Sequence, residues 1–467
     1  MGNKQIAVIG GGIAGLTAAY YLQKEIRTHQ LPYEVKLIEA SEELGGKIKT
    51  VKKDGFTIER GPDSFLARKT SAARLATEAG LEDELIRVSS GKSYILANGE
   101  LHSMPKGSFM GIPTQIKPFV TSSLFSIPGK LRAAGDFVLP KGKPQEDQAL
   151  GHFFRRRLGN EVVENMIEPL LSGIYSGDVD KLSLMATFPN FYDMEQKYGS
   201  LIRGLQETTA KPSKSGTQKK PGMFLTLKNG LSSLVTAVEE KLEEETVLKG
   251  VAVNQIEKKN ESYQLSLSNG KALSADAVIM AAPHLAAQKM LNQYDFMNEW
   301  KEMPSTSVAN VAMAFDAADI EDDIDGTGFV VSRNSDFRIT ACTWTHKKWP
   351  HTTPEGKALV RCYVGRPDDQ EVVHFSDEEI EEIVLRDLNK QMKIKGKPEM
   401  KVVTRWKNVM PQYTVGHKQR VQRVKEQMEQ HLPGVFLAGS SYEGIGLPDC
   451  IDQGENAVRD VLAFLNK

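Results

Sequence analysis

The first forty residues contain two short apolar runs separated by a helical pattern. Residues 6–9 (IAVI) form the first run, and a glycine-rich turn separates it from residues 16–22, which have helical character. The second run, residues 35–38, ends at Glu39. This order predicts a strand, a helix and a second strand parallel to the first, joined by a right-handed crossover.

Two later stretches lack this regularity. From about residue 90 to 170, proline and glycine punctuate apolar patches, which indicates a mostly helical insertion. Residues 207–222 are polar, rich in Lys and Ser and without periodicity, so we expect a loop at a domain boundary there.

The remainder predicts a mixed α+β region. A helix is expected to begin near Gly230, and others to span residues 377–392 and 451–465. Asn269–Gly270 predicts a turn between two strands. The expected strands are residues 247–253, 263–267, 277–280, 308–314, 328–332, 359–364 and 435–438.

Composition narrows the class of protein. The 467 residues correspond to about three domain-sized units. Balanced charge, 59 Lys+Arg against 60 Asp+Glu, excludes a broad nucleic-acid-binding surface. No run reaches the roughly 18 to 20 apolar residues of a membrane-spanning helix. Cys342, Cys362 and Cys450 are far apart, which argues against a disulfide framework or a cysteine metal site and indicates a cytoplasmic protein.

The glycine-rich turn carries the first functional signal. Gly10, Gly12 and Gly15 match the spacing of a dinucleotide-binding turn, in which Gly11, Ile13 and Ala14 would share the contact with a diphosphate. The diphosphate would lie at the helix N-terminus, which carries roughly half a positive charge. Glu39 ends the second strand, where its carboxylate can accept hydrogen bonds from ribose hydroxyls. The alternative is a tight turn followed by an exposed glutamate.

Two further motifs introduce a family. Residues 43–47 (ELGGK) and 59–64 (ERGPDS) resemble the second glycine motif of the amine oxidase-like FAD superfamily, although Glu42 and Glu43 replace a basic residue that many members carry. Residues 439–451 resemble the superfamily's C-terminal flavin motif, with Ser440 where many members have Asp. The resemblance implies bound FAD and adds these cofactor contacts: Ala40, Gly45, Gly46, Lys47, Gly61, Pro62, Asp63, Ser64, Gly439, Ile445, Gly446 and Leu447.

Within the superfamily, the whole chain is most similar to the coproporphyrinogen III oxidases of Gram-positive type, in the protoporphyrinogen oxidase family. The motifs are residues 59–66, 168–178, 305–311, 404–406, 410–413 and 442–451. The resemblance implies a haem-pathway enzyme that oxidises coproporphyrinogen III to coproporphyrin III by six electrons, with O2 as acceptor and three H2O2 formed. Protoporphyrinogen IX as a second substrate, and transfer partners among haem-pathway enzymes, are left open.

The same resemblance implies an α/β fold with interleaved domains. A Rossmann-like FAD-binding domain would comprise residues 1–69, 222–283 and 433–467. An α+β substrate-binding domain would comprise residues 70–90, 170–221 and 284–432. Residues 91–169 would form a helical domain, which in membrane-attached relatives rests on the bilayer. Residues 109–139 therefore predict either a peripheral membrane contact or a lid over the protein's own core.

Family positions also suggest substrate contacts. Lys69, Ile174 and Tyr363 would line the cavity, with Val253 and Trp406 near the cofactor. Each has an ordinary structural alternative, as a core, strand or solvated residue. No strong acid or base is expected, because flavin chemistry requires mainly binding and orientation. Candidate cations for the substrate propionates are Lys69, Arg333, Arg338, His346, Lys347 and Lys348.

Two other functions fit the same fold. One is an amine oxidase or carotenoid desaturase, which differs in the substrate that reduces the flavin. The other is a non-enzymatic binding protein like the GDP-dissociation inhibitors of small GTPases, which would not use FAD for catalysis.

Overall fold

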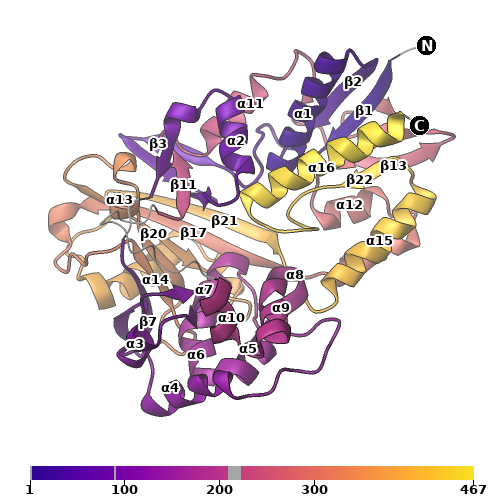
Figure 1. The fold of residues 1–467 in the computed structure, drawn as a ribbon. Coiled ribbons are helices and arrows are strands. Elements are labelled where there is room, and N and C mark those ends of the chain that lie inside the picture. The colour runs from indigo at the N-terminus through magenta and orange to yellow at the C-terminus, as the bar shows by residue number, and fades with distance from the viewer. Residues whose placement is uncertain (1–2, 89–90, 209–221, 467) are drawn as a thin grey trace. The chain divides into compact units, whose positions relative to one another are not determined.

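A computed structural model describes residues 3–88, 91–208 and 222–466 (Figure 1). The chain divides into two compact units. Unit 1 contains Met1–Val88, Gly222–Pro304 and Lys418–Lys467, and unit 2 contains Ser89–Pro221 and Ser305–His417. Each unit therefore combines segments that are far apart in the sequence.

Unit 1 is built on a five-stranded parallel sheet. The strand order is β12 (Val247–Leu248), β2 (Tyr33–Ile38), β1 (Lys4–Ile9), β16 (Ala277–Met280) and β22 (Val435–Leu437). β1 and β2 pair in parallel, as predicted. The chain leaves β1 toward β2 on one side, whereas β16 and β22 lie on the other. The strand order thus reverses beside β1, and ligands of such sheets bind outside the carboxyl ends of the strands at that point.

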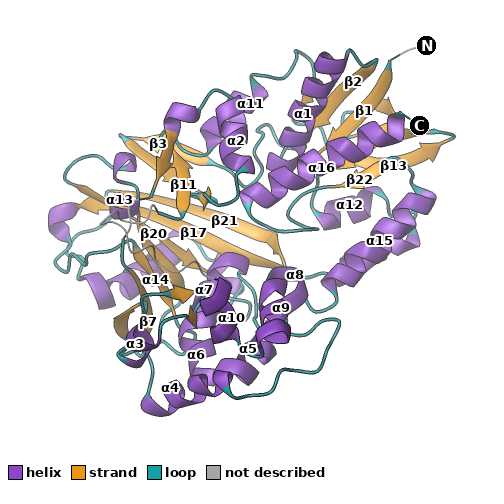
Figure 2. Cartoon of the chain, in the orientation of Figure 1, coloured by secondary structure: helices purple, strands orange, loops and turns teal. Residues whose placement is uncertain are grey.

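Helices α1 (Ile13–His29) and α16 (Leu447–Leu465) lie side by side in unit 1 (Figures 1 and 2). The close crossing needs a glycine, because a Cβ on Gly454 would come within 2.5 Å of the Ala14 carbonyl oxygen. α16 begins four residues before the predicted helix, since Pro448 is well accepted in a first turn. Lys4 Nζ donates to the Leu465 carbonyl oxygen at 2.7 Å, so the first strand and the last helix are joined.

Smaller elements complete unit 1. The helices are α2 (Ser71–Glu78), α11 (Ser232–Glu239), α12 (His284–Met290) and α15 (His417–His431), whose first residue belongs to unit 2. The antiparallel strands are β3 (Thr50–Lys53) with β4 (Phe56–Glu59); β5 (Phe65–Leu66), β11 (Phe224–Leu227) and β6 (Leu85–Arg87); and β13 (Val253–Lys259), β14 (Ser262–Leu267) and β15 (Ala272–Ala275).

The prediction of one strand over residues 247–253 is wrong. Its first part is β12 in the parallel sheet, and its last residue begins β13 in a separate antiparallel sheet. Gly250 interrupts the run with a φ of 67°, a conformation that favours glycine. The predicted turn at Asn269–Gly270 is confirmed between β14 and β15.

Unit 2 contains a seven-stranded mixed sheet. Its order is β21 (Met400–Pro411), β17 (Ser305–Asp316), β20 (Lys357–Val364), β19 (Ile339–Trp344), β18 (Gly328–Val331), β7 (Ser93–Ala97) and β8 (Glu100–Ser103). α13 (Thr345–Lys348) follows β19, and α14 (Asp377–Met392) matches the predicted helix residue for residue. A capping box between Ser376 and Glu379 begins α14, which explains the sharp boundary.

The expected helical insertion is wrong over its first part. Residues 93–103 form the β7–β8 hairpin, because Asn98 and Gly99 both adopt positive φ (52° and 81°) in the turn. That Asn-Gly pair is a sequence signal for a hairpin. From residue 116 onward the segment is largely helical, as predicted.

The remaining elements of unit 2 follow that hairpin. The short strands β9 (Ser108–Phe109) and β10 (Ile112–Pro113) pair with each other. The helices are α3 (Ile116–Val120), α4 (Ile127–Ala134), α5 (Leu150–Leu158), α6 (Asn160–Val162), α7 (Glu168–Tyr175), α8 (Leu184–Thr187), α9 (Pro189–Tyr198) and α10 (Leu201–Thr208).

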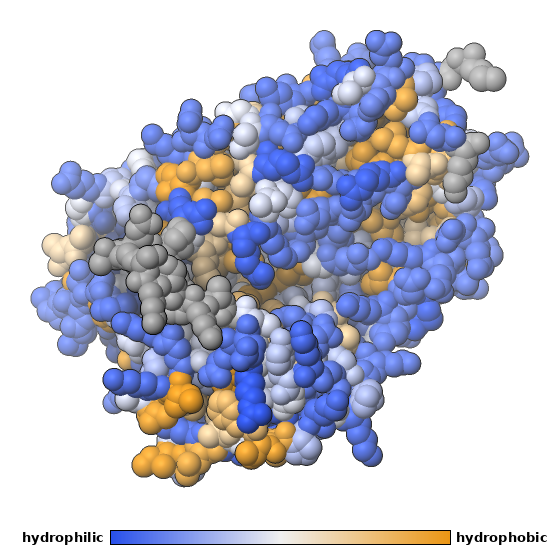
Figure 3. All heavy atoms as spheres, in the orientation of Figure 1, coloured by the Kyte–Doolittle hydropathy of each residue, from blue (hydrophilic) through white to orange (hydrophobic). Residues whose placement is uncertain are grey.

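Apolar side chains collect on the outside of these helices (Figure 3, over α3 and α4). Five are more than half exposed, and we call them the α3–α4 surface: Ile116, Val120, Ile127, Leu131 and Val138. No helix in the described part of the chain is long and apolar enough to cross a membrane.

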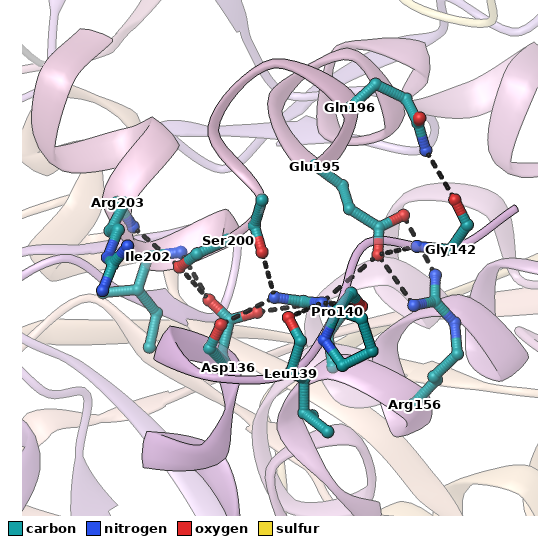
Figure 4. A network of polar contacts seen from close by, with 12 residues as sticks. Asp136, Leu139, Pro140, Gly142, Arg156, Glu195, Gln196, Ser200, Ile202 and Arg203 are labelled. Carbon is teal, nitrogen blue, oxygen red and sulfur yellow. Dashed lines mark hydrogen bonds and ion pairs between the residues drawn. The ribbon is translucent and has the colours of Figure 1, made fainter. Parts of the chain in front are cut away.

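A buried polar network in unit 2 joins α5, α9 and the segment around Asp136 (Figure 4). Arg157 of α5 has no exposed side-chain area, and its Nε donates to Asp136 Oδ1 at 2.6 Å. Its Nη1 lies 3.4 Å from Glu195 of α9, and its Nη2 donates to the Gly199 carbonyl at 2.7 Å. Asp136 also accepts the Ser200 hydroxyl and the Ile202 N–H. One guanidinium thus connects three separate segments.

The two units differ in extent from the expected domains. Residues 70–88, 284–304 and 418–432 were expected with the substrate domain, and they group with unit 1. For α2 the reason is local, because Ser71 Oγ donates to the Pro448 carbonyl of α16. Residues 91–169 group with the sheet of unit 2. The three-domain division stays a prediction, and most of the predicted loop 207–222 lies outside the described residues.

Candidate functional site

The dinucleotide turn lies where the strand order of unit 1 reverses. Gly10 follows β1 and Ala281 follows β16, and a Cβ on Gly10 would be 2.9 Å from the Ala281 carbonyl carbon. Gly10 has a φ of 105°, which strongly favours glycine. A Cβ on Gly15 would lie 1.9 Å from the Gly10 carbonyl oxygen. Close packing at these two positions explains the glycine spacing.

The second glycine motif lies directly against the first. Gly45 N–H donates to the Gly11 carbonyl at 2.8 Å. A Cβ on Gly46 would be 3.3 Å from Gly12 Cα. Two glycine motifs whose paired residues are more than thirty positions apart thus lie backbone against backbone.

Glu39 is fixed by its own chain at the end of β2. Its Oε2 accepts the Gly11 N–H at 2.6 Å, while Oε1 accepts the Ser41 N–H at 2.8 Å and the Ser41 hydroxyl at 2.6 Å. Two carboxylate oxygens offer about four acceptor sites, so three internal bonds leave capacity for another donor. The sequence predicted the carboxylate's place but not these bonds.

The N-terminus of α1 can receive an anion. Gly12 precedes the helix without a capping side-chain bond, and the first turn carries no acidic residue. A Cβ on Gly12 would meet no atom within 4 Å, so the space beside it is open. Free N–H groups and the helix dipole both favour a phosphate at such a position. These residues fit the diphosphate of a dinucleotide cofactor.

Lys47 supplies a cation to the same region. Its Nζ donates to Ser440 Oγ at 3.3 Å, and burial lowers the pKa of its ammonium group. Gly446 precedes α16 without a capping side-chain bond, and Asp449 places a carboxylate in the first turn of this helix.

The other predicted residues of unit 1 have partners within it. Lys69 forms an ion pair with Asp449 in the first turn of α16. Ser64 Oγ donates to Asp63 Oδ1 at 2.6 Å, and the Asp63 carbonyl accepts the Thr226 hydroxyl at 2.8 Å. Val253 begins β13 beside a register irregularity. The roles predicted for these residues, and for Ala40, Gly61 and Pro62, stay predictions.

Three predicted contacts lie in unit 2. Trp406 pairs with Val308 across β21 and β17, and Tyr363 of β20 lies under the Arg361 guanidinium, 5.4 Å from the ring centroid. Ile174 of α7 is 40% exposed, unusual for a core residue. The approach of these side chains to the cofactor stays a prediction.

The remaining candidate cations for propionates are all engaged within unit 2. Arg333 pairs with Glu168 and Asp368, Arg338 with Asp369, and Lys347 with Asp323. His346 Nδ1 contacts the Leu359 carbonyl, and burial lowers the pKa of its ring. Lys348 lies over the Trp349 ring. A propionate would have to compete with these partners, so none of them is identified as its cation.

Comparisons with known proteins decide the family. The family model described as "Flavin containing amine oxidoreductase" matches residues 13–462. The chain belongs to this family. As a flavin-containing amine oxidoreductase it is an FAD-dependent enzyme, so the glycine motifs have their expected cofactor.

Individual relatives cover the full chain. The coproporphyrinogen III oxidase of Bacillus subtilis is 56% identical, with 99% of each chain covered. That of Staphylococcus aureus is 45% identical over 99% of this chain and 100% of the relative. The crystal structure of an Exiguobacterium protein assigned as a protoporphyrinogen oxidase aligns with a TM-score of 0.88 and 38% identity, covering 100% of both chains.

Sequence reasoning did not predict one polar contact beside the dinucleotide turn. His284, which was not singled out, contacts Ser441 of the 439–451 motif. The available signal was the place of His284, four residues beyond the carboxyl end of a predicted parallel strand, where ligand-site residues of such sheets gather.

Proposed function

We propose that the protein oxidises coproporphyrinogen III to coproporphyrin III, with O2 as the final acceptor. The observation that carries the proposal is 56% identity over the full chain to a coproporphyrinogen III oxidase. Six hydrogens leave the macrocycle as three hydrides and three protons, and three O2 become three H2O2. When bound, FAD supplies the hydride acceptor for each two-electron step.

The chain's own residues have mainly a binding role in this reaction. Gly10–Gly15 and the N-terminus of α1 would hold the diphosphate, and Glu39 a ribose. Gly45, Gly46 and Lys47 would lie along the diphosphate and ribityl chain, and Ile445–Leu447 at the flavin ring. Gly439, Val253 and Trp406 would complete the cofactor contacts. The positive ends of two helices and Lys47 then favour an electron-rich cofactor.

The substrate contacts proposed are Lys69, Ile174 and Tyr363. Lys69 is half-buried and paired with Asp449, so it can transfer its ion pair to a propionate without a change of charge state. Ile174 offers an exposed apolar side chain to the macrocycle face.

The deciding experiment mixes the purified, FAD-loaded protein anaerobically with candidate reductants. Coproporphyrinogen III should bleach the flavin absorbance, whereas primary amines and phytoene should not. Bleaching by an amine alone would establish the amine oxidase alternative. A protein purified without stoichiometric FAD would favour the non-enzymatic class. The rates of flavin reduction by coproporphyrinogen and by protoporphyrinogen, measured on one preparation, then give the substrate preference.

We also propose that the α3–α4 surface contacts an anionic membrane. Residues 104–144 contain six cations, Lys106, Lys117, Lys130, Arg132, Lys141 and Lys143. The only acid in that stretch is Asp136, which is buried and paired with Arg157. This excess of cations beside apolar side chains matches the requirements of an anionic lipid surface, although Glu161 of α6 places one carboxylate at the N-terminus of α4.

Vesicle co-sedimentation tests this contact. The protein should bind phosphatidylglycerol vesicles more strongly than phosphatidylcholine vesicles, and added salt should weaken the binding. The double variant Ile127→Ser/Leu131→Ser should lose it. Met223→Ser, which removes an exposed apolar side chain of unit 1, is the matched control. Equal binding by both variants would contradict the proposal.

A further inference from the structure

His284 is a buried histidine with every polar atom engaged. It is the first residue of α12 and only 2% exposed. Its backbone N–H donates to Ser441 Oγ at 3.1 Å, its Nδ1 lies 3.2 Å from the same oxygen, and its Nε2 lies 3.2 Å from the Met303 carbonyl.

These contacts determine the direction of each bond. The Met303 carbonyl can only accept, so Nε2 carries the proton and Nδ1 is an acceptor. The Ser441 hydroxyl therefore accepts from the His284 backbone and donates to the His284 ring. The two bonds form a closed pair that holds the hydroxyl in one orientation. Burial and the nearby Lys47 charge lower the pKa of His284 to about 4, which keeps this arrangement neutral.

The pair lies at a turn that reaches the cofactor region. Ser441 follows Ser440, whose hydroxyl accepts the Lys47 Nζ bond at 3.3 Å. At the start of the turn, Gly439 N–H donates to Gln453 Oε1 of α16 at 3.1 Å. The turn is thus fixed at Gly439 by α16 and at Ser441 by His284, and Ser440 is held between these points.

Packing behind the turn supports the same arrangement. The buried Tyr442 hydroxyl donates to the Ala282 carbonyl at 3.2 Å, and its ring lies against Trp300, 5.4 Å between centroids. Ala282 belongs to the connection between β16 and His284. Residues 281–284 and 439–442 are therefore joined by hydrogen bonds at two points beside Gly10.

We propose that His284 is a positioning residue for the flavin, because it fixes the Ser440–Ser441 turn and thereby the Lys47 ammonium beside FAD. The inference rests on the proposed placement of FAD along Lys47. Its consequence is that removal of the His284–Ser441 bond should weaken FAD binding and lower the reduction potential of bound FAD, since the cation that stabilises added negative charge loses its position.

Two isosteric variants separate positioning from filling of space. Asn in His284→Asn can place an acceptor near the Nδ1 position and keep the Ser441 bond. Gln in His284→Gln can place a donor near the Nε2 position and keep only the Met303 bond. We expect His284→Asn to resemble the wild type in FAD dissociation constant, flavin absorbance and midpoint potential. His284→Gln and Ser441→Ala should bind FAD about tenfold more weakly, with a shifted spectrum and a more negative potential.

The outcomes distinguish the inference from the proposal on which it rests. Lys47→Ala should weaken FAD binding; an unchanged affinity would place FAD elsewhere and overturn the placement. If Lys47→Ala weakens binding but His284→Gln matches His284→Asn in all three measurements, the positioning role alone is wrong. Far-UV circular dichroism and urea unfolding of the FAD-free variants verify that each one folds. If His284→Gln does not fold, Ser441→Ala decides on the same measurements.

Discussion

Glu39 shows how one side chain can organise a binding loop before it meets a ligand. Its carboxylate joins the end of β2 to the Gly11 N–H and to Ser41. Because these bonds orient the carboxylate, a ribose hydroxyl would meet an acceptor already in place, and little side-chain entropy would be lost on binding.

Replacing Glu39 by Ala should weaken FAD binding by roughly 1.5 to 3 kcal/mol, the range for hydrogen bonds to a charged group. Since about 1.4 kcal/mol is tenfold in affinity, the dissociation constant should rise roughly ten- to hundredfold. Fluorescence titration of the FAD-free protein measures it. Glu39→Gln, which keeps one acceptor oxygen, should lose less affinity for FAD than Glu39→Ala. An unchanged constant in Glu39→Ala would contradict the ribose assignment.

Because the pKa of His284 is lowered in the folded protein, we expect the free energy of unfolding to depend on pH. Its pKa is about 4 in the folded protein and about 6.5 when unfolded, so the unfolded state binds a proton first on acidification. The contribution of neutral His284 to the free energy of unfolding is fully present above pH 6.5 and is lost as the pH falls toward 4. Its total is on the order of 3 kcal/mol. Urea unfolding between these pH values should show a smaller decline in His284→Asn, which cannot titrate. Parallel declines would contradict the assignment.

At the scale of elements, boundaries could be predicted wherever the local sequence determined them. The helical pattern predicted α14, whose N-terminal boundary is set by the Ser376–Glu379 capping box, and the glycine turn predicted the parallel β1–β2 pair. The β7–β8 hairpin was missed because its Asn98–Gly99 turn lay among proline and glycine punctuation. The split between β12 and β13 was missed although Gly250 stands inside the run, because the sequence does not show that the two parts join different sheets.

The helices of unit 2 depend on Arg157. Arg157→Ala would leave Asp136 as a buried carboxylate without its guanidinium partner, whereas Glu195 would keep its pair with Arg156. The variant should lower the free energy of unfolding by about 3–5 kcal/mol. Arg155→Ala removes a partly exposed ion pair with Asp180 from the same helix and should cost less than about 1 kcal/mol. Urea unfolding of both variants tests this. If both variants lost the same unfolding free energy, burial of the Arg157 network would not make it more stabilising than an exposed ion pair.

The whole molecule combines distant segments in each unit, and the sequence indicated this because cofactor motifs occur near both ends of the chain. What the sequence could not supply was the His284–Ser441 contact, which joins residues 157 positions apart. Nor did it show that each candidate propionate cation has a partner already.

FAD should stabilise unit 1 more than unit 2, since all the proposed cofactor contacts except Trp406 belong to unit 1. Free FAD at about a hundredfold excess over its dissociation constant should add about 2.7 kcal/mol to the unfolding free energy. Of the four tryptophans, Trp300 lies in unit 1, whereas Trp344, Trp349 and Trp406 lie in unit 2. In protein labelled with fluorotryptophan, added FAD should therefore raise the urea midpoint reported by Trp300 more than the midpoints reported by the three tryptophans of unit 2. Identical shifts would show that the units unfold together.

The Lys4–Leu465 hydrogen bond and the α1–α16 crossing have a consequence for biosynthesis. The dinucleotide turn leaves the ribosome first, but α16 and the Gly439 turn are made more than four hundred residues later. During translation the nascent turn lacks its contacts with α16, so we expect FAD to be retained only after residues 439–465 have been made. A ribosome stalled before residue 439 should carry a chain that does not retain the flavin, however long the cofactor is supplied.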